Sequence, residues 1–165
     1  PTKFTSREMF IVVAIDQAFI YGSNANSNGT QLSGIIPADR GEEIESTALK
    51  YVKLCNLPEH NALIRSVSWA PSMGRKHHFI ATGCKDGLVR IFKATESDGE
   101  LIVELVASLN EHKLEVWKVS WNLTGTILSS AGDDGKVRLW KSNYLNEWKC
   151  MSVIDSTHKD VEGQS

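Results

Sequence analysis

Three side chains of the types used in nucleophilic catalysis recur in the second half of the chain. His112 precedes one apolar stretch, Ser130 lies in the next, and Asp134 follows four residues later. An imidazole, a hydroxyl and a carboxylate can form a hydrolytic triad when they meet in space. The same groups can instead form a buried relay of hydrogen bonds, because a hydroxyl and an imidazole both donate and accept. Trp140 favours the relay, since its indole N–H supplies a further donor.

A second set of similar residues lies fifty-odd positions earlier and supports the structural interpretation. This earlier set consists of His60, Thr82, Asp86 and Phe92. Each member precedes its counterpart by 48 residues, except the histidine, which precedes its own by 52. A set that recurs at a repeat period is typical of a repeated structural unit. Phe92 has no N–H where the later copy has Trp140, so we expect the earlier relay to be cut short.

The elements that must position these groups are predicted to be strands. Asp86-Gly87 and Asp134-Gly135 are strong signals for tight turns, because glycine adopts a positive φ without steric cost. The order of histidine, strand, Ser or Thr, Asp-Gly turn, strand and tryptophan is typical of one blade of a WD-repeat β-propeller. We therefore predict an all-β fold, a WD-repeat propeller fragment of about three blades. The predicted strands cover residues 9–14, 18–21, 49–54, 64–69, 79–84, 88–93, 101–106, 116–121, 126–130, 137–140 and 148–154.

The strand pattern divides the chain into six segments. We interpret them as a partial degenerate blade (1–21), a flexible insertion loop (22–46), two WD blades (47–93 and 94–141), a last outer strand (142–154) and a polar tail (155–165). Polar and acidic composition indicates the loop, and a turn is expected at residues 56–59. Propellers usually hold 4–8 blades, and the chain does not begin with Met. We therefore expect it to be a fragment of a longer chain.

Composition and charge exclude several classes of protein. The net charge of −2 gives no electrostatic case for nucleic-acid binding, and no apolar run is long enough to span a membrane. The N-terminus lacks the apolar region of a signal peptide. Three cysteines at unrelated spacings suit a reducing compartment. The basic residues on the predicted strands and turns are scattered and are interpreted as solvated or rim groups: Lys85, Arg90, Lys136 and Arg138.

No catalytic, metal or cofactor site is predicted. The glycines of Gly132-Asp133-Asp134-Gly135-Lys136 lack the spacing of a phosphate-binding loop, and two carboxylates would repel a phosphate. His77 and His78 are adjacent in a predicted loop, where neighbouring side chains rarely point at one ion. Outside the relay, no nucleophile, base and oxyanion donors converge.

Three segments resemble one family closely: residues 62–72, 80–87 and 115–141. The family is the small WD-repeat nucleoporin known as the Sec-thirteen homologue, in what looks like its fungal form. The resemblance covers residues 47–154, and residues 8–21 more weakly. It implies the C-terminal half of an open, six-bladed propeller, to which a helical-solenoid nucleoporin donates a seventh blade.

The resemblance also implies a function without catalysis. Family members are scaffold subunits of the outer-ring Y complex of the nuclear pore, where they support protein and mRNA transport together with other Y-complex nucleoporins. They also serve in a coat-like complex at the vacuolar surface that regulates TOR signalling. Contact with the membrane is then indirect, through the assembly, and nucleic acid is not bound directly. The alternatives are a vesicle-coat propeller subunit and a WD receptor that reads a peptide on its top face.

The expected partner would pack against the last predicted blade through apolar contacts. A half-propeller leaves an apolar sheet face and unpaired strand edges open, and both invite association. The candidate partner-facing residues are Val116, Trp117, Val119, Trp121, Val137, Leu139, Trp148 and Met151.

Overall fold

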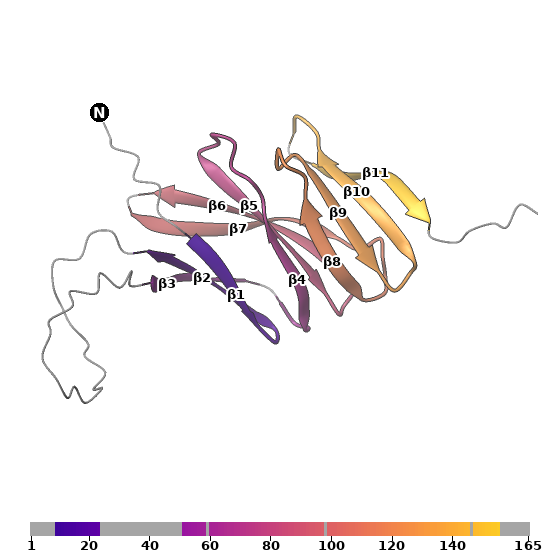
Figure 1. Cartoon of the computed structure of the whole chain (residues 1–165), viewed down its shortest axis with the longest axis horizontal. Helices are drawn as coiled ribbons and strands as arrows, with labels where there is room; N and C mark the ends of the chain where they lie inside the picture. The colour runs from indigo at the N-terminus through magenta and orange to yellow at the C-terminus, as the bar shows by residue number, and fades with distance from the viewer. Residues whose placement is uncertain (1–8, 24–50, 59, 98, 146, 156–165) are drawn as a thin grey trace, which may run out of the picture.

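The computed structural model describes residues 9–23, 51–58, 60–97, 99–145 and 147–155, and their only regular secondary structure is β-strand (Figure 1). The strands form three antiparallel sheets with the orders β1-β2-β3, β4-β5-β6-β7 and β8-β9-β10-β11. The prediction of an all-β fold with about three blades is confirmed. The strands are β1 (Met9–Ala14), β2 (Gln17–Ser23), β3 (Tyr51–Leu57), β4 (Ile64–Trp69), β5 (His77–Cys84), β6 (Val89–Ser97), β7 (Glu100–Leu109), β8 (Val116–Trp121), β9 (Ile127–Gly132), β10 (Lys136–Ser142) and β11 (Trp148–Asp155).

Each sheet is offset by one strand from the sequence segments interpreted as blades. β3 opens the segment 47–93, yet it pairs with β2 and completes the first sheet. In the same way β7, from the segment 94–141, completes the second sheet by pairing with β6. The first strand of each repeat is therefore the last strand of the preceding sheet.

Several strands extend beyond the bounds that the sequence predicts, as β2, β3 and β5 illustrate. β2 continues to Ser23, within the segment predicted as a loop, and residues 24–46 of that segment lie outside the described residues. β3 includes Asn56 and Leu57, where a turn was expected, because Asn56 pairs with Phe19. β5 begins at His77, where a loop was expected, because His77 pairs with Thr95. Pairing with a neighbouring strand thus overrides weak local propensity.

Two glycines allow the hairpins that present the turn aspartates. Gly87 and Gly135 have φ values of 82° and 69°, in the left-handed region that side chains disfavour. A Cβ on Gly87 would also lie 2.9 Å from the carbonyl carbon of Lys113, in the connection between β7 and β8. The Asp-Gly turns are therefore required by backbone conformation and, at Gly87, by packing as well.

The core lies between the sheets as two apolar clusters. Between the second and third sheets, residues such as Ala81 and Ile91 pack against Val119 and Leu128. Between the first and second sheets, residues such as Ile20 pack against others that include Ile80, Cys84 and Phe92. Each large aliphatic side chain that is fully buried contributes roughly 1.5–3 kcal/mol. The second sheet is therefore covered on both faces and holds the other two in place.

Candidate functional site

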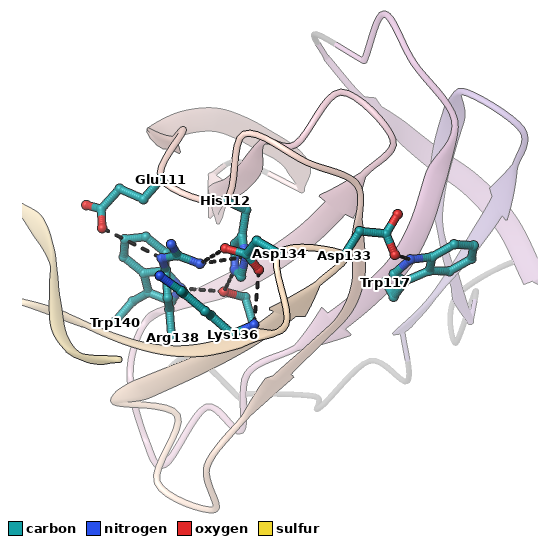
Figure 2. Close-up of polar contacts among 9 residues, drawn as sticks. Glu111, His112, Trp117, Asp133, Asp134, Lys136, Arg138 and Trp140 are labelled. Carbon is teal, nitrogen blue, oxygen red and sulfur yellow. Dashed lines mark hydrogen bonds and ion pairs between the residues drawn. The ribbon is translucent and has the colours of Figure 1, made fainter. Parts of the chain in front are cut away.

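The four predicted relay residues of the third sheet lie in hydrogen-bonding contact (Figure 2). Ser130 Oγ on β9 accepts the indole N–H of Trp140 on β10 at 2.7 Å. The same oxygen lies 2.7 Å from His112 Nε2, and His112 Nδ1 lies 2.9 Å from Asp134 Oδ1 in the β9–β10 turn. All donors and acceptors are satisfied when the Ser130 hydroxyl donates to Nε2 and Nδ1–H donates to Asp134.

Asp134 is the charged end of this relay. Its Oδ1 also accepts the backbone N–H of Lys136 at 3.2 Å, and its Oδ2 pairs with the Arg138 guanidinium. Burial raises the pKa of this carboxyl, but the hydrogen bonds from His112 and Arg138 outweigh that effect and hold the pKa below its usual value. Asp134 is therefore an anion throughout the physiological pH range.

The relay of the second sheet is incomplete. His60 Nε2 lies 2.9 Å from Thr82 Oγ1, but Phe92 offers only a ring, centred 5.4 Å from the His60 ring. Asp86 makes no hydrogen bond to His60 and instead accepts from the backbone N–H of Leu88 and from Arg90. His60 Nδ1 is buried without a hydrogen-bond partner among the described residues.

Two arginines that the sequence analysis interpreted as solvated are buried beside the turn aspartates. Arg90 lies 2.7 Å from Asp86, and Arg138 pairs with Asp134, in each case four residues along the chain. The interpretation as solvated or rim groups was wrong for both, because each guanidinium satisfies the charge of the adjacent aspartate. Their separation of 48 residues, which equals the spacing of the two aspartates, was a signal that could have identified them.

The relay geometry does not suit nucleophilic catalysis. Ser130 is 1% exposed, and its hydroxyl oxygen is engaged by both His112 and Trp140. A nucleophile needs a free approach to the substrate. We infer that the relay serves to fix the β9–β10 turn, the two strands that it joins and the segment before β8 that carries His112.

Three of the candidate partner-facing residues cannot contact a partner. Val116, Val119 and Trp121 on β8 are buried in the core against the second sheet, together with Ala81 and Val89. Their burial follows from the direct packing of β8 on β4 and β5. The apolar side chains of β8 therefore hold the two sheets together.

The opposite face of the third sheet carries two candidates that are only partly buried, Val137 and Leu139. Val137 lies directly opposite Ala131 on β9 and Ile154 on β11, so these side chains share one face. Leu139, two residues along β10, projects from the same face. Ile154 is 54% exposed. This open face, defined by Ala131, Val137, Leu139 and Ile154, touches no other sheet in the part of the chain that the structure describes.

The other two candidates lie on β11. Trp148, at the start of the strand, packs on the core side, with its ring centred 5.5 Å from that of Trp121, and so does not extend the open face. Met151 is exposed and lies where the pairing of β10 with β11 is irregular.

Trp117 forms a separate, partly exposed cluster near the relay turn. Its side chain is 47% exposed, and the Arg65 guanidinium lies 4.4 Å from its ring centre. Its indole N–H donates to Asp133, as Figure 2 shows, and Arg65 pairs with Glu115. This Trp117 cluster joins β4 of the second sheet to β8 of the third at the end where the relay turns lie.

The described residues form neither a metal site nor a membrane-spanning helix. Nowhere in these ranges do three His, Cys, Asp or Glu side chains gather closely enough to hold a metal ion. The described residues also contain no helix long and apolar enough to cross a membrane.

The two repeats match a family model, and most of the chain matches named relatives. The family model described as WD domain, G-beta repeat, matches residues 51–93 and 103–141. The protein named nucleoporin SEH1 of Saccharomyces cerevisiae is 42% identical, over 93% of this chain and 49% of that protein. Nucleoporin seh1 of Schizosaccharomyces pombe is 39% identical, over 93% and 45%. Human nucleoporin SEH1 is 39% identical, over 74% and 36%. The chain thus spans about half the length of the two yeast relatives it matches.

Proposed function

This chain is a WD-repeat protein built of propeller blades, and on that premise we propose that it belongs to a nucleoporin, a non-enzymatic scaffold subunit of the nuclear pore. The single observation that carries the proposal is the open face of the third sheet, where Val137 and Leu139 are only partly buried and Ile154 is exposed on one side of a blade. Apolar surface of this kind, rimmed by polar residues, marks a protein interface. Relatives named nucleoporin SEH1 supply the class of assembly.

The finer assignment concerns the partner. A helical-solenoid nucleoporin of the outer-ring Y complex would donate a blade that covers the open face and completes an open propeller. The family resemblance supplies this partner class, and the open face supplies a surface of matching character. By the same resemblance, a second pool would sit in a coat-like, TOR-regulating complex at the vacuolar surface.

The test is a charge placed on the open face of the intact protein. Leu139→Glu should reduce co-purification of the helical nucleoporin at least tenfold, because a carboxylate buried in an apolar interface loses its hydration. A tenfold loss corresponds to about 1.4 kcal/mol. Binding of the unaltered protein should change little with salt, since screening acts mainly on exposed charges. The tagged variant should also leave the nuclear rim.

Leu123→Glu is the matched control, because Leu123 is 90% exposed in the turn after β8, away from the open face. It should bind as the unaltered protein does. If Leu139→Glu keeps its melting temperature and still co-purifies the helical nucleoporin, the proposed interface is incorrect. If a vesicle-coat solenoid is recovered in its place, the vesicle-coat alternative replaces the nuclear pore assignment.

One observation favours a second candidate, the receptor that reads a peptide on its top face. The Trp117 cluster presents a fixed, half-exposed aromatic ring flanked by charged groups. Hydrogen exchange on the intact protein separates the two candidates. Protection of β10 and β11 by the co-purified partner supports the scaffold, whereas protection confined to the loops around Trp117 supports the receptor.

A further inference from the structure

The outer seam between the second and third sheets holds a cavity that the proposed function does not use. The sheets pack together where β8 meets β4 and β5, and the cavity lies outside that contact, between β5, β6, β7 and β11. It has a volume of about 210 Å³ and is lined by His77, Phe79, Lys93, Glu104, Val106 and Trp148.

Packed aromatic rings form the apolar wall of this cavity. Phe79 and Trp148 meet edge to face with their centroids 5.7 Å apart, and both rings also pack on Trp121. Rings fixed in this way make the wall rigid before anything binds. Pockets for drug-sized molecules occupy about 300–1,000 Å³, so this smaller cavity suits a single aliphatic side chain.

The register of the second sheet shows that the seam continues beyond the cavity. Lys93 on β6 lies directly opposite Phe79 on β5 and Glu104 on β7, so these three side chains share the face that lines the cavity. Ile102, two residues before Glu104, projects from the same face and is 49% exposed. A bound chain could therefore lie along β7.

The charges at the seam are unbalanced toward positive. Lys93 makes no hydrogen bond or ion pair within the described ranges. Arg75, whose guanidinium lies 5.7 Å from the Phe79 ring centre, donates only to the carbonyl oxygens of Pro71 and Gly125. These two cations face one lining carboxylate, that of Glu104.

The histidine in the cavity responds to the same charges. Burial lowers the pKa of His77, and the positive charges of Lys93 and Arg75 lower that pKa further. The lowered pKa disfavours protonation of the His77 ring, so Lys93 and Arg75 supply the positive charge beside the cavity. The surroundings of the cavity favour a negatively charged group in the ligand.

We propose that the outer seam binds an extended segment of a partner protein in which an aliphatic side chain lies beside acidic ones. The aliphatic side chain fills the cavity between Phe79, Val106 and Trp148. A neighbouring carboxylate pairs with Lys93 and Arg75. This surface is distinct from the open face of the third sheet, so one molecule could hold both partners at once.

The test uses a labelled peptide and the intact protein. The probe is fluorescein-labelled Gly-Ser-Gly-Asp-Leu-Asp-Leu-Gly-Ser-Gly, followed by fluorescence anisotropy. Peptides with both leucines replaced by serine, or both aspartates by lysine, should bind at least tenfold more weakly. Lys93→Glu should weaken binding of the acidic probe at least tenfold, and Glu104→Lys should strengthen it.

Two further variants separate loss of the site from loss of the fold. Val106→Phe fills the cavity and should abolish binding while the melting curve stays cooperative. Lys85→Glu makes the same charge change as Lys93→Glu at an exposed turn and should bind normally. If Val106→Phe fails to fold, the binding measured for Lys93→Glu and Glu104→Lys tests the proposal.

Three outcomes would overturn the proposal. The first is absence of measurable binding of the acidic probe at millimolar concentration. The second is equal binding of the acidic and lysine-containing peptides. The third is binding that survives Lys93→Glu but is lost in Leu139→Glu, which would place the peptide on the open face. None of these results affects the scaffold assignment, because the scaffold test measures binding of the helical nucleoporin at the open face.

Discussion

Asp134 and Asp86 occupy equivalent turns, yet they hold different partners. Asp134 accepts hydrogen bonds from His112, Arg138 and a backbone N–H, whereas Asp86 accepts only from Arg90 and a backbone N–H. Asp134→Ala should therefore destabilise the intact protein by about 2–3 kcal/mol, and Asp86→Ala by about 1 kcal/mol less. Urea midpoints at unchanged m-value measure the difference. Equal losses would show that His112 contributes nothing through the relay.

His60 should make stability depend on pH. Burial and the positive charge of Arg90 lower the pKa of His60 to about 4, while Asp86 and Asp16 act in the opposite direction. The unfolded histidine titrates near 6.5. Between these values the unfolded chain binds a proton that the folded one does not, so stability is lost as pH falls from about 6.5 to 4.

His60→Gln should remove this part of the pH dependence. Because the ring is only half-buried, we expect the unaltered protein to lose about 1–2 kcal/mol more than the variant between pH 7 and 4.5. Denaturant unfolding at each pH gives the two slopes. The window lies above the range where Asp134 would be protonated. Parallel slopes for the two proteins would contradict the assignment to His60.

The relay was predicted from residue types and spacing, but its ionic part was missed. The hydroxyl and the carboxylate recur at an offset of 48 residues and the imidazole at 52, and that recurrence indicates that these groups lie together, although the indole of Trp140 has no counterpart in the earlier set. Arg90 and Arg138 recur at the same offset, but a basic residue on a strand is exposed in most proteins. Only the position of the turn aspartate, four residues earlier and facing the same side, explains their burial.

At the scale of the strands, close packing of β5 on β8 makes Gly83 sensitive to substitution. A Cβ on Gly83 would lie 2.8 Å from Val116 Cγ1 and 3.3 Å from the Val116 carbonyl oxygen. Gly83→Ala should destabilise the intact protein by about 1–3 kcal/mol, because the core is already filled. Thermal and urea unfolding measure this loss.

The double variant is the decisive control. Val116→Ala removes the methyl group that the new Cβ would meet, so the loss in Gly83→Ala with Val116→Ala should be smaller than the sum of the two single losses. Additive losses would show that the contact with the Val116 side chain is not the cause.

Strand centres were predictable, whereas some strand ends were not. Alternation and β-branched residues located the middle of every described strand. Asn56 and His77 favour a loop by type, yet both are paired, because the neighbouring strands β2 and β6 continue past them. Such ends are determined by the partner strand, which a local pattern does not include.

At the scale of the molecule, the repeat predicted the sheets but not which face of the last one is covered. β8 and β10 both alternate apolar side chains with others, so the sequence alone presents Val119 and Leu139 as equivalent. The stacking of the sheets distinguishes them: Val119 is buried against the second sheet, and Leu139 is on the open face. Burial between sheets depends on how distant segments of the chain pack together, which the local periodicity of apolar residues does not encode.

The offset of one strand between repeat and sheet has a consequence for how this architecture can change. The unit that a gene duplication would copy is the repeat, yet that unit cannot form a sheet by itself, because its first strand belongs to its neighbour. Loss of one repeat therefore removes a strand from one sheet and supplies the same position from the next repeat, so every sheet between the ends stays complete. The unit of inheritance and the unit of folding differ, and that difference lets the number of blades vary while incomplete sheets arise only at the two ends of the array.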